Sequence, residues 1–389
     1  MTSLPPLALY VHVPWCVRKC PYCDFNSHGI GRSATLPEAE YLEALLADLD
    51  ADLPLAGGRE LVSVFIGGGT PSLLSAGFYR RLLEGVAARL PLAADSEITL
   101  EANPGTLERG RFAGYREAGV NRLSLGVQSF QAEQLAALGR IHDGADAEAA
   151  FAEARAAGFD NLNVDLMHGL PGQTPEMALA DLERALALAP EHLSWYQLTL
   201  EPNTEFYRYP PALPEEEALW EIQDRGHERL EAAGLQRYEI SAYARPGRRS
   251  RHNLNYWRFG DYLGIGAGAH GKLSRADGAG GLAIERRWKS RQPEAYLRRR
   301  QDPRGFVADA HPVDREELAL EFAMNALRLP EGVPMAVWEA ATGQPRERLT
   351  ARLAGARKKG LLVEDADRLQ ASPRGLLFLN ELLASIDES

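Results

Sequence analysis

Strand and helix patterns alternate over the first 200 residues, and this alternation limits the fold more than any other feature. A first helix is predicted at residues 36–53, and Ser75, Thr106 and Thr174 are suitable N-caps for later helices. Short apolar runs predict six strands at residues 7–13, 61–66, 97–100, 122–125, 161–166 and 192–200. Six such repeats indicate an α/β fold with a parallel sheet and outer helices. The pattern leaves a partial barrel and a doubly wound sheet as alternatives.

The last quarter of the chain has a different character. Its apolar periodicity changes from alternating strands and helices to short helices with one small hairpin. A longer helix is predicted before this region, at residues 215–233. Within the region, helices are predicted at residues 314–329, 346–359 and 373–386, with a hairpin formed by residues 361–364 and 368–371. This order resembles a small α+β winged-helix-like module. The sequence therefore predicts two domains, at residues 1–302 and 303–389.

Composition and charge argue against two classes of protein. The chain has 389 residues, 45% of them hydrophobic, and a formal net charge of −11. This acidity disfavours nucleic-acid binding, for which the run Arg357-Lys358-Lys359 is slight support. No stretch approaches the roughly 20 apolar residues of a membrane span, and residues 1–13 lack a basic signal region. We expect a cytoplasmic protein, for which peripheral membrane contact stays open.

All three cysteines of the chain lie within one eight-residue window. Cys16, Cys20 and Cys23 follow the first predicted strand with the spacing C-x3-C-x2-C. An odd number of clustered cysteines is a poor disulfide framework, whereas thiolates are good ligands for zinc or iron–sulfur clusters. Three ligands on one loop suit a cluster with one open iron. Structural zinc, with His12 or His28 as a fourth ligand, is the alternative.

Polar residues recur where the predicted strands end. The second strand runs into a Gly-Gly-Gly-Thr turn at residues 67–70, where glycines allow close approach of a ligand and backbone amides can face an anion. Glu101, Gln128 and Asp165 follow or end later strands, and Arg140 lies in the segment after the fourth strand. Each of these residues, taken alone, is explained equally well as a core polar residue whose hydrogen bonds are satisfied. Their recurrence at one end of successive strands predicts a polar mouth beside the cysteine loop.

Together these features resemble the radical SAM (S-adenosylmethionine) superfamily. Within it, the chain is similar over nearly its whole length to the group of oxygen-independent coproporphyrinogen III oxidases and HemW-type heme chaperones. The resemblance implies a partial (β/α)6 barrel and a [4Fe–4S] cluster on Cys16, Cys20 and Cys23. It implies that SAM chelates the fourth iron and can be cleaved to a 5′-deoxyadenosyl radical. The residues implied at SAM are Tyr10, Gly68, Gly69, Thr70, Glu101, Gln128, Arg140 and Asp165, with His270 near the adenine.

Two features separate the oxidases from the heme chaperones. The oxidases carry a fourth cysteine two residues after the third, where this chain has Phe25, and a longer segment precedes their cysteine loop. Residues 252–257 resemble the H-N-x-x-Y-W motif of the chaperones, which implies His252 as a heme ligand and Tyr256 and Trp257 as porphyrin-facing surface. From the residues alone, a strand or turn with packed aromatics is the better explanation of this segment, and the resemblance reverses that preference. The preceding basic residues suit heme propionates or a solvated surface: Arg248, Arg249 and Arg251.

The favoured hypothesis is therefore a heme chaperone that binds heme and transfers it to heme proteins such as respiratory enzymes. Its cofactors are a [4Fe–4S] cluster and SAM. A homodimer is compatible with the sequence, which does not fix the oligomeric state. The alternative is radical decarboxylation of coproporphyrinogen III, which Phe25 argues against. The sequence does not decide whether SAM is consumed.

Overall fold

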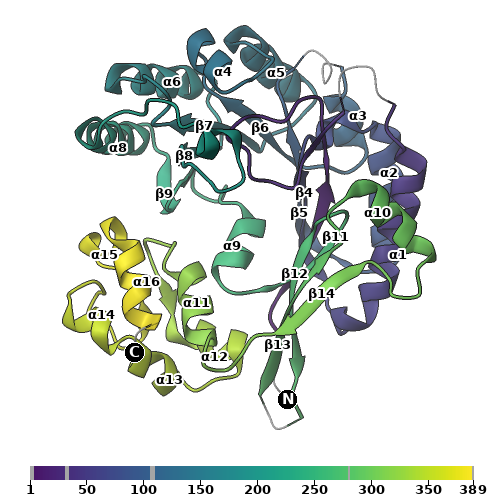
Figure 1. The fold of residues 1–389 in the computed structure, drawn as a ribbon, viewed down its shortest axis with the longest axis vertical. Coiled ribbons are helices and arrows are strands. Elements are labelled where there is room, and N and C mark those ends of the chain that lie inside the picture. The colour runs from purple at the N-terminus through teal and green to yellow at the C-terminus, as the bar shows by residue number, and fades with distance from the viewer. Residues whose placement is uncertain (1–3, 31–34, 106–109, 279–280, 388–389) are drawn as a thin grey trace.

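Six parallel strands form the centre of one large sheet (Figure 1). The computed structural model describes residues 4–30, 35–105, 110–278 and 281–387. The central strands are β1 Leu7–Val13, β4 Leu61–Gly68, β5 Leu92–Ala102, β6 Arg122–Gln128, β7 Leu162–His168 and β8 His192–Gln197. Their order in space is their order in sequence, whereas a doubly wound sheet reverses its strand order at a switch point. The partial barrel is therefore confirmed, and the doubly wound alternative is wrong.

Helices cover the outer side of the curved sheet, and the short helix α9 lies on its inner side in Figure 1. Ser75 Oγ accepts from the amide of Phe78 and Thr174 Oγ1 from that of Met177, which confirms both predicted N-caps. Thr106 lies outside the described residues. The helices up to α9 are α1 Glu38–Ala56, α2 Ala76–Ala87, α3 Phe112–Glu117, α4 Ala132–Ala137, α5 Gly144–Ala156, α6 Pro175–Ala187, α7 Glu205–Arg208, α8 Glu216–Ala232 and α9 Arg251–Trp257, with a 3-10 turn at Pro71–Leu73.

The sheet continues past both ends of the six central strands. On one side β11 is parallel to β1, and three antiparallel strands follow it; on the other side β10 and β9 extend β8. The described strands leave β14 and β9 as free edges, so the barrel is open. The added elements are β9 Gln236–Glu239, β10 Ala242–Ala244, β11 Asp261–Ile265, β12 His270–Ala276, β13 Leu282–Lys289, α10 Pro293–Arg298, a 3-10 turn Arg299–Gln301 and β14 Val307–Pro312.

The C-terminal module packs its own core against the barrel. Phe322 and Trp338 are buried in this core together with Phe259 and Ile284 of the barrel domain. Residues 307–312 still belong to the large sheet, so the chain after residue 303 first completes the barrel. No helix among the described residues is both long and apolar enough to cross a membrane. The elements of this module are α11 Leu318–Ala326, β15 Val333–Pro334, α12 Met335–Thr342, α13 Arg346–Arg352, α14 Ala354–Lys358, β16 Arg368–Leu369, α15 Pro373–Leu377 and α16 Leu379–Asp387.

Three predicted elements of this module differ in detail. The hairpin is reduced to one bridge between Leu362 and Ala371, because β16 pairs with β15 instead. The helix predicted at residues 346–359 is two helices that meet at Leu353, and the last helix is interrupted at Phe378. The hydrophobic periodicity continues through both breaks, so it could not reveal them.

Candidate functional site

The cysteine loop begins directly after β1 and is held in place by short-range and long-range contacts. A two-strand pairing of β2 Trp15–Cys16 with β3 His28–Gly29 closes the loop at its base. The carboxamide of Asn26 donates to the carbonyl oxygens of Ala267 and Arg291, both at 2.9 Å. All three thiols line one cavity of about 360 Å³ at the carboxyl ends of the central strands. The loop therefore presents its thiols to the polar mouth that the sequence predicts.

The arrangement of the thiols fits a polynuclear cluster better than a single metal ion. Among the described residues, no three His, Cys, Asp or Glu side chains gather as ligands of one ion. The ring nitrogens of His12 are already bonded to Tyr10 Oη and to the carbonyl oxygen of Asn26, at 2.9 and 2.8 Å. Burial raises the pKa of the Cys16 and Cys23 thiols, so a positively charged group is needed to hold them as thiolates.

Two neighbouring groups are placed to support thiolate sulfur atoms. Thr70 Oγ1 donates to Cys16 Sγ at 3.4 Å, and Arg140 Nη1 lies 3.8 Å from Cys20 Sγ. A guanidinium beside a sulfur and a hydroxyl donor to another both favour the charged form of a thiol. The residues present therefore fit a cluster held by three cysteines.

The amides of the Gly-Gly-Gly-Thr turn are bonded to the cysteine loop and to the side chain of Glu101. The amide of Gly69 donates to Val13 O and that of Thr70 to Trp15 O, both at 2.7 Å. The amide of Gly68 donates to Glu101 Oε2 at 3.1 Å. A Cβ at residue 69 would lie 2.5 Å from the carbonyl oxygen of Trp15, so only glycine fits there. The turn contributes by letting the loop approach β4 closely, because its amides are already used.

Acidic side chains from two strands face the same cavity. Glu101 at the end of β5 and Asp165 in β7 line it, together with Gln128, which ends β6 with a φ of 69°. Burial, together with the nearby Asp165, raises the pKa of Glu101 from 4.5 to about 8. Asp165 accepts hydrogen bonds from Ser124 Oγ at 2.9 Å and from Asn163 Nδ2 at 2.8 Å. These carboxyl groups are the acceptors that the cavity offers to a ligand with amino or hydroxyl groups.

Arg140 is fixed in the wall of the same cavity. Its Nη2 donates to Asn103 Oδ1 and to the carbonyl oxygen of Gly126, both at 2.6 Å. These bonds orient the guanidinium between the cysteine loop and the strand ends, where it also lines the cavity. A fixed guanidinium of this kind pairs well with a carboxylate.

Three of the expected site residues do not line this cavity. Tyr10 is turned toward His12 within the barrel, and His270 is exposed with its ring 6.1 Å from that of Trp288. His252 is only 1% exposed; its Nδ1 is bonded to Ser63 Oγ and its Nε2 to Tyr256 Oη, both at 2.9 Å. Heme iron could reach His252 only if one of these bonds broke. The expectation of a strand or turn is wrong here, because residues 251–257 form helix α9.

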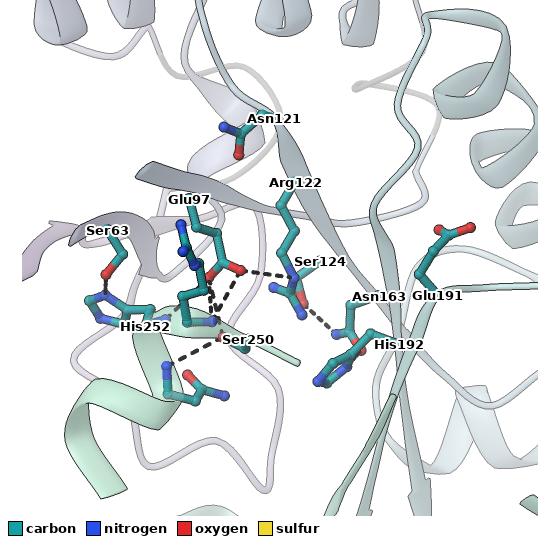
Figure 2. Close-up of polar contacts among 12 residues, drawn as sticks. Ser63, Glu97, Asn121, Arg122, Ser124, Asn163, Glu191, His192, Ser250 and His252 are labelled. Carbon is teal, nitrogen blue, oxygen red and sulfur yellow. Dashed lines mark hydrogen bonds and ion pairs between the residues drawn. The ribbon is translucent and has the colours of Figure 1, made fainter. Parts of the chain in front are cut away.

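The start of α9 is anchored by a buried polar network that fills the lower barrel (Figure 2). Glu97 Oε1 accepts from the amides of Arg251 and His252, at 3.1 and 3.2 Å. Arg122, 2% exposed, lies beside it with Nε 4.0 Å from Glu97 Oε2. Figure 2 shows Ser63 and Ser250 on the side of His252, and Asn163 with His192 on the other side. The first turn of the H-N-x-x-Y-W segment is thus fixed from inside the barrel.

The three arginines next to this helix all pair with carboxylates. Arg248 contacts Asp160 at 3.2 Å, Arg249 contacts Glu331 at 2.8 Å, and Arg251 contacts Asp95. A propionate at any of them would have to displace an existing partner. The sequence left two roles open for these arginines, propionate binding and a solvated surface run. Their ion pairs favour the surface run.

Some residues of the cavity wall were not singled out from the sequence. Tyr196 and Gln197 at the end of β8 obey the same strand-end rule that identified Glu101, so this signal was available. Tyr22 lies within the cysteine loop itself. Met167, Leu198 and Glu201 also line the cavity, and nothing in their local pattern distinguishes them from core or loop residues.

Comparisons with known proteins agree with this architecture. Residues 10–185 match the Radical SAM superfamily, and residues 313–378 match the HemN C-terminal domain. A solved structure titled as coproporphyrinogen III oxidase (HemN) from Escherichia coli superposes with a TM-score of 0.80 at 25% identity, over 99% of this chain and 90% of that one. The superposition therefore covers the barrel and the C-terminal module together.

Curated relatives extend the similarity along the sequence. The chain is 52% identical to heme chaperone HemW of Escherichia coli K12, over 98% of each protein. It is 49% identical to heme chaperone HemW of Haemophilus influenzae, again over 98% of each. A mitochondrial radical S-adenosyl methionine domain-containing protein 1 of Bos taurus is 38% identical, over 97% of this chain and 87% of that protein. The chain therefore belongs to the HemW family of radical SAM proteins.

Proposed function

We propose that this protein binds heme and transfers it to heme proteins, and that it carries a [4Fe–4S] cluster with SAM in the cavity described above. The observation that carries the proposal is the identity of 52% to a heme chaperone over 98% of both chains. The cavity supports it, because three thiols and a set of fixed polar groups line one space.

Each polar group of the cavity has a role that its surroundings allow. Cys16, Cys20 and Cys23 would hold three irons, and SAM bound at the fourth would supply radical chemistry. Glu101 is placed to accept from an α-amino group, and Asp165 from ribose hydroxyls. The remaining contacts are proposed for Gly68, Gly69, Thr70, Gln128 and Arg140, with the glycines acting by their close packing.

Oxidation of coproporphyrinogen III is the second candidate, and the superposition on an oxidase favours it. Phe25 argues against it. This residue is 64% exposed at the cavity, in the position where the oxidases carry a further cysteine. The protein has no thiol to take that role, because Cys16, Cys20 and Cys23 are its only cysteines. We expect no decarboxylation.

One anaerobic experiment tests both functions. The reconstituted protein should contain about four iron and four sulfide per chain and should bind about one heme. With SAM and a reductant, it should form no protoporphyrinogen IX from coproporphyrinogen III. Cys16→Ala, Cys20→Ala or Cys23→Ala should remove the brown chromophore. Protoporphyrinogen formation without heme binding would favour the oxidase, and zinc without sulfide would contradict the cluster.

The proposal also names the partners. The acceptors are heme proteins such as respiratory enzymes, which the protein meets in the cytoplasm or at a membrane surface, and the proposed assembly is a homodimer supported by the cluster and SAM. Mixing the heme-loaded protein with an apo-acceptor should move the heme absorbance to the acceptor fraction on size-exclusion chromatography. Sedimentation of the protein with and without its cluster and SAM measures the proposed dimer.

A further inference from the structure

Most imidazoles of this chain are buried or half-buried. The structure describes all nine histidines, and five of them are buried, among them His252. Two more are half-buried, and only His270 and His311 are exposed. With the described residues, neither exposed ring forms a hydrogen bond, whereas both nitrogens of His252 do. An incoming heme therefore meets His270 and His311 first.

The two exposed rings flank one tryptophan on a single sheet face. His270 in β12 pairs in register with Trp288 in β13, and His311 in β14 pairs with Arg286, two residues before Trp288. Because side chains alternate along a strand, Trp288 and Arg286 share a face. The ring of His311 lies 5.5 Å from that of Trp288, tilted by 64°. The ring of His270 lies 6.1 Å away, tilted by only 26°.

The same face leads into a cavity lined by the H-N-x-x-Y-W segment. This cavity of about 230 Å³ lies between α9, the sheet and α11, and Tyr256, Trp257, Tyr262 and Arg286 line it. Arg286 Nη1 donates to Tyr262 Oη at 3.0 Å, and its Nη2 pairs with Glu321. Cavities that enclose ligands usually measure roughly 300–1,000 Å³. One edge of a flat ligand fits here, and the rest would lie over Trp288.

We propose that heme lies across this face, with its ring over Trp288, one edge in the Tyr256–Trp257 cavity, and its iron bound by His311. This inference rests on the proposed heme-binding function. An axial imidazole must stand steeply to the porphyrin plane. The 64° tilt of His311 satisfies this for a porphyrin stacked on Trp288, whereas the 26° tilt of His270 makes it part of the stacking surface.

Charge and protonation at this face suit the same ligand. Partial burial, with the nearby charges of Arg291 and Arg286, lowers the pKa of His270, so its ring stays neutral and apolar enough to stack. Arg291, exposed beside this face, supplies positive charge for a propionate. The H-N-x-x-Y-W segment then acts through Tyr256 and Trp257, while His252 holds α9 in place.

Hemin titration of the full-length, cluster-loaded protein tests the assignment. His311→Ala should raise the heme dissociation constant at least tenfold and remove the spectrum of histidine-ligated heme, and added imidazole should restore that spectrum. Trp288→Ala should weaken binding about threefold or more and keep the ligand spectrum. The matched controls on α8, Trp220→Ala and His227→Ala, should bind heme like the wild type. Because His311 is exposed on an edge strand, its variant should keep the wild-type melting temperature.

The outcomes separate this inference from the function on which it rests. If the wild type binds no heme, the proposed function fails. If the wild type binds heme and His311→Ala keeps both affinity and spectrum, the site is wrong while the function stands. Loss of the spectrum in His252→Ala, with cluster and melting temperature unchanged, would move the ligand to α9 and overturn the proposal.

Discussion

Glu101 is the residue of the cavity whose protonation should control ligand binding. Burial and the neighbouring Asp165 raise its pKa to about 8, so at pH 7 most molecules carry a neutral carboxyl group. Only the carboxylate accepts strongly from a charged α-amino group. SAM affinity should therefore rise with pH between 6.5 and 8, by up to about tenfold per unit well below the pKa. Isothermal titration of SAM into the cluster-loaded protein at each pH measures this affinity.

The matched variant is Glu101→Gln, which keeps the shape of the side chain and cannot ionise. It should bind SAM more weakly at pH 8 than the wild type and lose most of the pH dependence. A wild-type affinity that is constant from pH 6.5 to 8, or that falls, would show that Glu101 does not accept from the amino group.

At the residue scale, chemistry was easier to predict than orientation. Cys16, Glu101 and Asp165 were found because a strand end fixes where a side chain emerges, and the structure brings them to one cavity. The histidines could not be sorted in this way. Whether an imidazole is enclosed depends on partners far away in sequence, as His252 shows by its bond to Ser63, 189 residues away.

Helix α9 shows at the element scale how a short helix depends on one buried carboxylate. Glu97→Ala would leave two amides of the first turn without their acceptor and the buried Arg122 without its ion-pair partner. We expect the free energy of unfolding to fall by about 2–4 kcal/mol. Glu97→Gln keeps a neutral acceptor and should lose roughly half as much. Urea denaturation measures both.

The exposed Glu133 on α4 supplies the control, since Glu133→Ala should change the free energy of unfolding by less than about 0.5 kcal/mol. A loss at Glu97 that is no larger than the loss at Glu133 would mean that the carboxylate does not anchor α9. Elements with regular periodicity, such as α8, were predicted to within one residue at each end. The seven-residue α9 was not, because its stability comes from Glu97 and its own N-cap Ser250.

At the scale of the whole molecule, a buried ion cluster joins the antiparallel strands to the barrel. Lys289 of β13, 1% exposed, contacts Asp48 and Asp52 of α1, and Arg287 also contacts Asp52, at 2.7 Å. Lys289→Met would leave two carboxylates buried with too little positive charge. The free energy of unfolding should fall by about 3–5 kcal/mol in chemical denaturation.

Two variants make this prediction sharper. Lys289→Met with Asp48→Asn removes one of the stranded charges and should recover part of the loss. Arg275→Ala, which breaks a largely exposed pair with Glu285, should cost less than about 1 kcal/mol. Equal losses for Lys289→Met and Arg275→Ala would contradict the role of the buried cluster.

The overall architecture could be predicted from local sequence patterns more completely than its details. Six repeats in sequential order leave little freedom, because right-handed crossovers place each strand beside the last. The antiparallel strands β12–β14 could not be predicted in the same way. Their pairing is fixed by distant partners such as Lys289 with Asp48, 241 residues away, which leave no local pattern.

The two bonds of Asn26 have a consequence for biosynthesis. This residue follows the last cysteine by three positions, yet its partners are the carbonyl groups of Ala267 and Arg291. The ribosome must add about 265 further residues before both partners exist, which takes on the order of 10–50 s at usual elongation rates. During that time the thiols emerge into the cell without their final framework. The cysteine loop therefore reaches its final framework only after most of the chain has been translated.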